Sequence, residues 1–361
     1  MPLIGFDAQA ICGKLTGLGT YTSFLLEALQ REIAPPLELR ILSRGKPLAR
    51  DLNTLERLGW ENWTLPELAQ RSKVDLLHIP AFAPAYRKCC KRVVTVHDIA
   101  GMLFPNQMGV LSRFYWGRWL PFTIKQADRI IVDSEHTQKD LIDHLKVNKN
   151  MIRVIYPSGH ETFSAQISGT KIAEVKQAFG INNNYFLFVG TLEPRKNLGR
   201  ILDAFKLFLN SNPGHQLILV GSQEFAHGKY SRILAGKHSL EPHSIIAPGY
   251  LDHDNLNALY CGASALLFPS LYEGFGIPIL EAMASGCPVL TSNRTSTPEV
   301  AGEAGILVDP YDTEAMARAM ERIASEPALR SELKKKGFEQ IKKFSWQKTA
   351  QEVIEVYKEL L

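Results

Sequence analysis

Long apolar runs are absent: nowhere does the sequence have the ~20 uninterrupted apolar residues that a membrane-spanning helix needs. The first residues also lack the basic leader of a secretory signal and include Asp7. A net charge of +4 at pH 7 is too small to indicate a nucleic-acid partner. We therefore expect a cytoplasmic protein with no membrane span and no nucleic-acid ligand, whose charge still leaves room for a locally basic face.

Cysteine is scarce, and pairs of cysteines at metal-ligand spacing are missing. The five cysteines are odd in number, which favours reduced thiols in a cytosolic protein over a disulfide framework. Redox activity of the adjacent Cys89 and Cys90 stays open as a less favoured interpretation. The cysteines are Cys12, Cys89, Cys90, Cys261 and Cys287.

The sequence does have the length and composition of a folded two-domain protein: 361 residues, 45% of them hydrophobic and 22% charged. Short continuous apolar runs alternate with helix-period segments, which indicates strands buried on both faces in parallel sheets. Two successive series predict an α/β fold with two doubly wound domains. The predicted strands are Leu3–Phe6, Leu37–Leu42, Leu76–Ile79, Val93–Val96, Ile130–Val132 and Met151–Ile155, then Tyr185–Val189, Leu217–Val220, Ile245–Ala247, Ala265–Phe268, Val289–Thr291 and Ile306–Val308.

A polar stretch at Ser158–Thr170, which follows Pro157, marks the predicted domain boundary. We expect a first domain over residues 1–165 and a second over 166–345. Ser345 can cap a final helix, and we expect this helix, about 346–361, to pack back on the first domain.

The first candidate site motif is Thr16-Gly17-Leu18-Gly19-Thr20, placed directly before a predicted helix at Tyr21–Gln30. Glycines let a ligand approach the backbone, and a helix N-terminus offers amides and the positive end of a dipole to a phosphate. The third glycine of a dinucleotide fingerprint is absent. Plain turn chemistry is the alternative for this motif.

The second motif is His97-Asp98, at the end of the predicted strand Val93–Val96. Carboxyl ends of parallel strands face the ligand crevice, so His97 can hydrogen-bond a hydroxyl or take up a proton there. The alternative is a histidine that Asp98 and backbone groups satisfy.

The third motif, GTLEPRKN, places Arg195 and Lys196 after the strand Tyr185–Val189. Two such cations can neutralise a diphosphate, Arg195 by forked hydrogen bonds and Lys196 as a point charge. A solvated pair of cations in a loop is the alternative.

The fourth motif, SLYEGFGIP, carries the strongest signal and continues to Glu281. Gly274 and Gly276 free backbone amides for oxygen atoms, and Pro278 suits a first helical turn. Glu273 and Glu281 can then accept hydrogen bonds from hydroxyls in one crevice, while the helix start attracts phosphate. A favourable contact of Glu281 with the helix dipole is the alternative.

Together these motifs resemble those of family 4 (group 1) retaining glycosyltransferases of the GT-B fold, close to the mannosyltransferase-like bacterial group. GLGTY, HD, GTLEPRKN, LYEGFGIP, EAMA, PEV and FSW match in order, and Glu273 and Glu281 match the family's E-x7-E motif. The likeness covers nearly the whole chain. It implies two Rossmann-like domains facing across a cleft, the first on the acceptor side and the second binding a nucleotide sugar.

The resemblance implies a role for each matching residue. Lys196 and Arg195 would hold the donor diphosphate, Glu281 the ribose, and Glu273 would face the transferring sugar. With His97 at the reaction centre, the implied catalytic residues are His97, Arg195, Lys196 and Glu273. The implied donor-binding residues are Gly17, Gly19, Arg195, Lys196, Leu251, Glu273, Gly274, Phe275, Gly276, Ile277 and Glu281.

Two features depart from the family or imitate another fold. The usual phosphate-binding arginine two residues after the strand's glycine is missing, and Thr191 and Leu192 stand there, which shifts the charge to Arg195 and Lys196. The segment Asp252-His253-Asp254 superficially resembles the Asp-x-Asp metal site of the other major glycosyltransferase fold. We interpret it as a loop in which Asp254 caps a helix.

The implied activity is the retaining transfer of a hexose, without metal or cofactor, to a glycan or lipid-linked acceptor of a cell-surface polysaccharide such as lipopolysaccharide. GDP-mannose is the favoured donor. The alternatives are a UDP-sugar or dTDP-deoxysugar donor, a sugar-nucleotide-binding protein with an inactive site, and a GT-B phosphorylase or sugar-nucleotide epimerase.

The segment 108–125, MGVLSRFYWGRWLPFTIK, mixes aromatic and basic residues, as in helices that lie at an anionic membrane interface. Peripheral contact at the inner face of the cytoplasmic membrane would suit a lipid-linked acceptor. Gly117 and Pro121 are expected to break a clean amphipathic helix, and aromatic residues of the core or acceptor cleft are the alternative.

Overall fold

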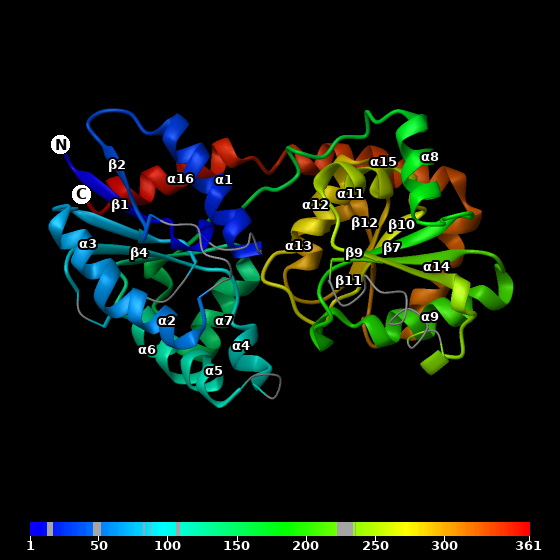
Figure 1. Ribbon diagram of the computed structural model, residues 1–361, viewed down its shortest axis with the longest axis horizontal. Coiled ribbons are helices and arrows are strands. Elements are labelled where there is room, and N and C mark those ends of the chain that lie inside the picture. Colours follow the sequence, from blue (N-terminus) through cyan, green and yellow to red (C-terminus); the bar gives the residue numbers. More distant parts are fainter. Residues whose placement is uncertain are drawn as a thin grey trace. The chain divides into compact units, whose positions relative to one another are not determined.

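The computed structural model describes residues 1–12, 17–45, 52–81, 84–86, 88–105, 109–221, 234 and 236–361. The chain divides into two compact units, shown in Figure 1. The first contains Met1–Ser158 and Phe344–Leu361, and the second contains Gly159–Lys343. Thr16 of the glycine motif and Met108 of the aromatic segment lie outside the described residues.

Each unit is built on a six-stranded sheet whose paired strands are all parallel. The first sheet has the order β2-β1-β3-β4-β5-β6 and the second β12-β11-β10-β7-β8-β9. The strands are β1 Leu3–Asp7, β2 Glu38–Leu42, β3 Leu76–Ile79, β4 Lys91–Val96, β5 Arg129–Val132, β6 Ile152–Val154, β7 Tyr185–Val189, β8 Gln216–Val220, β9 Ile245–Gly249, β10 Ala265–Phe268, β11 Val289–Ser292 and β12 Gly305–Val308.

All twelve predicted strands are present, with ends that differ by at most two residues. The prediction of two doubly wound parallel sheets is therefore confirmed. Its physical basis is visible in β7, where all five residues are hydrophobic and buried, because a sheet covered on both faces needs apolar side chains on both sides of a strand.

Helices connect the strands. They are α1 Gly17–Glu32, α2 Thr54–Gly59, α3 Leu65–Arg71, α4 Ala100–Leu103, α5 Val110–Phe114, α6 Leu120–Ile124, α7 Glu135–Leu145, α8 Gly169–Ala178, α9 Leu198–Ser211, α11 His253–Gly262, α12 Ile277–Ala284, α13 Thr297–Ala301, α14 Thr313–Ser325, α15 Pro327–Ile341 and α16 Trp346–Lys358, with π-helical turns η2 Trp60–Thr64 and η4 Tyr115–Trp119 and the 3-10 turn η6 Pro194–Lys196. Among the described residues, no helix is both long and apolar enough to cross a bilayer.

The C-terminal helix α16 packs against α1 in the first unit, although the two are far apart in the chain (Figure 1). Trp346, Val353 and Tyr357 join the core that Phe6 and Leu25 form. The Ser345 side chain accepts a hydrogen bond from the Lys348 amide and caps this helix, as predicted.

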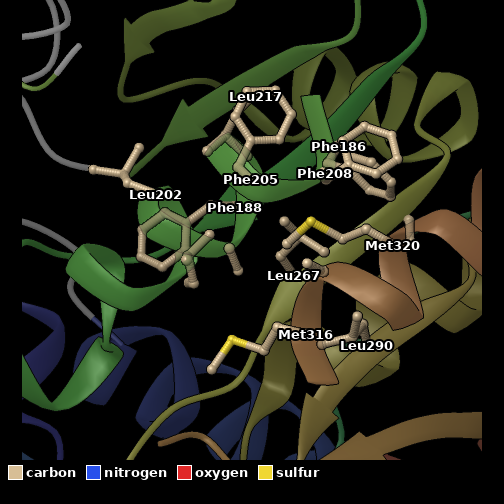
Figure 2. Packing of buried hydrophobic residues seen from close by; sticks show 14 of the residues in the cluster. Phe186, Phe188, Leu202, Phe205, Phe208, Leu217, Leu267, Leu290, Met316 and Met320 are labelled. Atoms are coloured by element: carbon tan, nitrogen blue, oxygen red, sulfur yellow. The ribbon is translucent and has the colours of Figure 1, made fainter. Parts of the chain in front are cut away.

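The core of the second unit lies between its sheet and the helices α9 and α14 (Figure 2). Phe205 and Phe208 of α9 meet Met316 and Met320 of α14, and all four side chains are fully buried. This packing fixes the helix that follows the Arg195-Lys196 turn.

Three local predictions are wrong. The helix expected at Tyr21–Gln30 already begins at Gly17, so the described glycines of the motif belong to its first turn rather than to a loop. Asp252, not Asp254, caps α11, because the chain is extended at Asp252 and its carboxylate accepts the amide of Asn255 at 2.8 Å.

The third error concerns the segment around Gly117 and Pro121, which does not break. It is helical from Val110 to Ile124, through α5, η4 and α6. Pro121 falls in the first turn of α6, and the wider η4 turn precedes it. A π turn changes the hydrogen-bond pattern to i→i+5, which accommodates a residue that cannot donate.

Candidate active site

Two loops meet at the carboxyl edge of the second sheet, since β7 and β10 are neighbours. The amide of Leu271 donates to the carbonyl of Arg195 at 2.7 Å. The buried Asn197 side chain donates to the carbonyl of Pro269 at 3.0 Å and takes a left-handed backbone (φ 63°). One backbone hydrogen bond and one from the Asn197 side chain thus hold the Arg195-Lys196 turn against the segment after β10.

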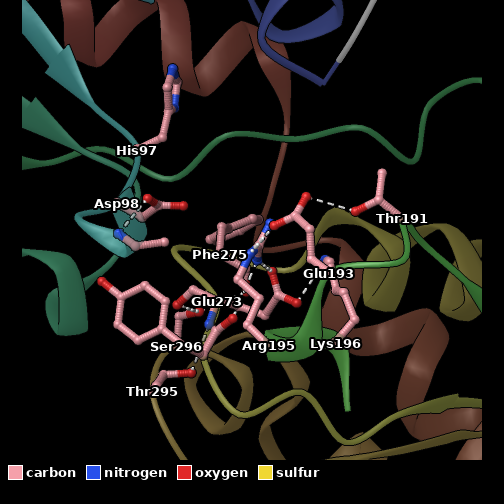
Figure 3. Close-up of polar contacts among 12 residues, drawn as sticks. His97, Asp98, Thr191, Glu193, Arg195, Lys196, Glu273, Phe275, Thr295 and Ser296 are labelled. Carbon is pink, nitrogen blue, oxygen red and sulfur yellow. Dashed lines mark hydrogen bonds and ion pairs between the residues drawn. The ribbon is translucent and has the colours of Figure 1, made fainter. Parts of the chain in front are cut away.

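Glu273 lies between the two cations (Figure 3). Its carboxylate accepts Arg195 Nη1 at 2.9 Å and Lys196 Nζ at 2.7 Å. Only 5% of Glu273 is exposed, so this carboxylate would be strongly destabilised without its partners. Lys196 Nζ also lies 4.8 Å from the ring centre of Phe268 in β10, a cation–π contact.

A second carboxylate, which the sequence did not single out, holds the other edge of Arg195. Arg195 Nε donates to Glu193 at 2.6 Å, and the Thr191 hydroxyl donates to the same carboxylate at 2.7 Å. Partial burial raises the pKa of Glu193, but Arg195 and the Thr191 hydrogen bond outweigh it and lower the pKa overall. Thr191 therefore takes part in the site by fixing the residue that orients Arg195.

Helix α12 begins at this cluster. Gly276 is its N-cap with φ 110°, a conformation that favours glycine, and Pro278 lies in the first turn. The Ser296 hydroxyl hydrogen-bonds the carbonyls of Glu273 and Phe275, each at 2.9 Å. These bonds hold the segment 273–277 as a rigid approach to the helix N-terminus.

Glu281 lies one turn inside α12 and contacts a residue absent from the predicted site. The hydroxyl of Tyr260, from α11, donates to Glu281 Oε2 at 2.9 Å. Burial raises the pKa of Glu281 to about 7, although the Tyr260 hydrogen bond lowers it. The protonation of this carboxyl therefore changes near neutral pH.

In the first unit, His97 makes hydrogen bonds through both ring nitrogens. Nδ1 lies 2.6 Å from Asp133 Oδ2 and Nε2 lies 2.8 Å from the carbonyl of Pro80. Burial lowers the pKa of His97, but the Asp133 carboxylate outweighs it and the pKa is raised overall. An imidazolium can donate through both nitrogens, which fits both acceptors.

The carboxylate that pairs with His97 is Asp133, not the Asp98 of the alternative interpretation, and the Asp98 carboxylate accepts the amide of Ala100 at 2.8 Å. Asp133 directly follows β5, as His97 follows β4. A search for acids directly after apolar strands would have found it.

The remaining predicted residues are distributed over both units. Gly17 and Gly19 lie in the first turn of α1, and Gly19 is buried. Leu251 is partly buried between β9 and α11. The structure thus joins Arg195, Lys196 and Glu273 directly. The other predicted donor residues of the second unit lie on the segment that continues from Glu273 into α12, except Leu251, which follows the edge strand β9.

Arg195 and Lys196 bring two positive charges to this site. The described part of the chain contains no group of three histidine, cysteine or acidic residues arranged to hold a metal ion. Arg195 and Lys196 are together the cations that a diphosphate would meet after β7. The arrangement can bind a phosphorylated ligand and stabilise negative charge that develops on it.

Comparison with known proteins gives two family matches. Residues 171–340 match the model described as glycosyl transferases group 1, and residues 16–158 match that of glycosyltransferase family 4. O-antigen chain mannosyltransferase B of Escherichia coli is 36% identical over 383 residues, covering 98% of either chain. Serotype-specific mannosyltransferase WbdA of Escherichia coli is 31% identical over 286 residues, which are 77% of this chain.

The chain spans about a third of the length of the WbdA relatives, the match covering 34% of theirs. Among solved structures, Anabaena Alr3699/HepE in complex with UDP and glucose superposes with a TM-score of 0.73. It is 17% identical, and the match covers 100% of both chains. At that identity the likeness concerns the fold.

Proposed function

Because this chain belongs to the family 4, group 1 glycosyltransferases and has their GT-B fold, we propose that it transfers a hexose, with retention of configuration, from a nucleotide-diphosphate sugar. The acceptor would be a glycan or a lipid-linked sugar in the synthesis of a cell-surface polysaccharide. In this proposal the first unit takes the acceptor and the second takes the donor.

The observation that carries this proposal is the buried contact of Glu273 with Arg195 and Lys196. Without ligand, the two carboxylates Glu193 and Glu273 balance the two cations. A diphosphate brings stronger acceptors, so we expect it to take over hydrogen bonds of Arg195 and Lys196. Glu273 would then be released toward the hydroxyls of the transferring sugar.

The chemical step follows from the same charges. When the bond between sugar and phosphate breaks, negative charge grows on the leaving diphosphate, and the preorganised Arg195 and Lys196 stabilise it. These two cations supply charge that a divalent metal would supply elsewhere, so we expect transfer to continue in a chelator. In the same proposal, the acceptor's hydroxyl oxygen forms the new bond to the anomeric carbon of the sugar, and the leaving phosphate accepts the proton of that hydroxyl.

His97 is assigned to the acceptor side of the reaction centre. Because its raised pKa and its two acceptor partners favour the imidazolium, we expect it to supply positive charge rather than to remove a proton. Gly17 and Gly19, at the start of α1, are assigned to the donor phosphate.

GDP-mannose is the donor that we propose first, because the relatives reported above include mannosyltransferases. UDP-sugar is the second candidate, because Alr3699/HepE shares the fold and was solved with UDP and glucose. We expect Glu281 to bind ribose in either case, since ribose is common to both donors, whereas contacts near Leu251 would meet the base.

Thermal-shift binding of GDP, UDP, dTDP and ADP, then of their sugar conjugates, tests the proposal in the presence of a chelator. GDP and GDP-mannose should raise the melting temperature most. Selective stabilisation by UDP or dTDP would replace the donor and keep the site. A protein that responds to none of them would contradict the donor site itself, and binding without turnover would favour an inactive nucleotide-sugar-binding protein.

A further inference from the structure

The helical segment 110–124 of the first unit turns apolar side chains toward solvent. Val110 is 84% exposed, Phe114 50% and Phe122 48%. A soluble surface rarely keeps several large apolar residues together on one helix, and such a patch indicates an interaction site. The outward side chains of this segment and of the residue that follows it are Val110, Leu111, Arg113, Phe114, Arg118, Phe122 and Lys125, which we call the 110–125 face.

The opposite side of the same segment packs against the rest of the first unit. Tyr115 is buried and its hydroxyl donates to the buried Glu61. Trp116 lies against Gly101, where a Cβ atom would approach it within 2.6 Å. Leu120 and Ile124 are buried as well. The segment is therefore anchored with a fixed side toward solvent.

The π turn η4 keeps the exposed residues in register. Val110, Phe114, Arg118 and Phe122 recur at every fourth position, and all four are exposed. On an α-helix of 3.6 residues per turn this spacing would drift around the axis. A wider turn at Tyr115–Trp119 reduces the drift. Phe122 further stacks with the exposed Tyr86, ring centres 5.7 Å apart.

The charge of this face has one sign. Between Asp98 and Asp128 the sequence has no acidic residue, and its cations there are Arg113, Arg118 and Lys125. All three are exposed. A protein partner would need an acidic groove shaped for bulky side chains, whereas a bilayer offers anionic headgroups above an apolar layer at any point of its surface.

We propose that the 110–125 face binds an anionic lipid bilayer, with Val110, Phe114 and Phe122 entering the acyl boundary and Arg118 and Lys125 meeting headgroup phosphates. The helix lies in the plane of the interface. This extends the proposed function, in which a lipid-linked acceptor would lie at such a bilayer. Vesicle binding itself requires neither donor nor transfer.

Cosedimentation of the full chain with two kinds of vesicle tests the proposal: phosphatidylcholine alone, and phosphatidylcholine mixed with phosphatidylglycerol. The protein should bind the anionic vesicles, and binding should weaken as salt rises. Phe114→Ser should weaken it about tenfold through lost apolar burial. Arg118→Glu should weaken it by about fivefold or more, since each cation near an anionic surface contributes about that factor.

Matched controls lie on α9 of the second unit, where Leu207 and Lys206 are also exposed. Leu207→Ser and Lys206→Glu should leave vesicle binding unchanged. The proposal is overturned if the unaltered protein stays in solution with anionic vesicles, or if the control variants lose as much binding as Phe114→Ser and Arg118→Glu do.

The alternative occupant of this face is a second copy of the chain, and sedimentation velocity tests for it. The proposal is overturned if the protein does not bind vesicles but forms concentration-dependent dimers that Phe114→Ser abolishes. The face would then be a self-association surface. Nucleotide binding measured without vesicles should be the same in all four variants. A protein that binds vesicles but no nucleotide would refute the proposed function and keep this surface.

Discussion

Both units place charged side chains after the carboxyl ends of their parallel strands, but they satisfy them differently. In the second unit, Glu273 forms ion pairs with both Arg195 and Lys196, and Arg195 also pairs with Glu193. In the first unit, His97 pairs with a single carboxylate, Asp133, and its other nitrogen meets a backbone carbonyl.

This difference indicates which side chains can exchange their present partners for a ligand. Arg195 and Lys196 are held by carboxylates that a diphosphate can replace in kind, because both offer oxygen acceptors with negative charge. His97 is held by a carboxylate and by a backbone carbonyl of its own unit. We therefore expect its two hydrogen bonds to stay in place when a ligand binds. We infer that the cations at the second edge exchange their carboxylate partners for the donor diphosphate, whereas His97 keeps its partners when ligand binds.

The largest effect that the comparison predicts is the loss of transfer activity when Lys196 is replaced. Lys196→Ala should lower kcat for transfer at least about 10²-fold, because it removes stabilisation of the leaving diphosphate and leaves Glu273 with one cation. Steady-state rates of nucleotide release from the donor measure it. Because Lys196 also binds the donor diphosphate, Lys196→Ala should raise the donor KM as well. His97→Ala, at the other edge, should raise the donor KM far less than Lys196→Ala does. Equal KM effects of the two changes would contradict the distinction between the edges.

Glu281→Ala should come next, with donor affinity lowered about tenfold or more, because hydrogen bonds to a charged group are lost. Isothermal titration of the nucleoside diphosphate measures this change. Glu332→Ala, at an exposed position of α15, is the control and should bind as the unaltered protein does. Unchanged affinity in both Glu281→Ala and Lys196→Ala would refute the site.

Tyr260→Phe should have a smaller, pH-dependent effect. It removes the hydrogen bond that lowers the pKa of Glu281, which is already about 7. More of the carboxyl is then protonated at pH 7, and a protonated carboxyl accepts fewer hydrogen bonds. We expect about fivefold weaker nucleotide binding at pH 7 and nearly normal binding at pH 9.

The control for that change is Tyr185→Phe. It also removes a buried tyrosine hydroxyl, one that donates to the carbonyl of Leu259 in α11 at 2.8 Å, but it does not touch Glu281. Its effect on binding should not depend on pH. A pH-independent loss in Tyr260→Phe would show that this residue only supports the fold.

The smallest effect concerns stability at the first edge. A histidine whose folded pKa is raised stabilises the fold fully below its unfolded pKa of about 6.5, and this stabilisation is lost as pH rises through the folded value. Asp133→Asn removes the main cause of the raised pKa of His97. The melting temperature of the Asp133→Asn variant should therefore lie about 2 °C or more below that of the unaltered protein at pH 6. The difference should shrink at pH 9, and a difference that grows with pH would reverse the assignment.

The sequence by itself determined the two parallel sheets and the family. Strand burial on both faces is written in local apolar runs such as Tyr185–Val189, and Ser345 could be assigned as a cap because a capping bond spans three residues. The motif around Glu273 and Glu281 was likewise recognisable from adjacent residues.

Only the tertiary structure decided which partners these residues have. Lys196 meets Glu273 across 77 residues, His97 meets Asp133 across 36, and Tyr260 meets Glu281 across 21. A hydrogen bond across such a separation depends on how strands are ordered in the sheet, which no local pattern encodes. The outward side of the segment 110–124 was decided in the same way, because the burial of Tyr115 against Glu61 fixed which side of the helix faces water.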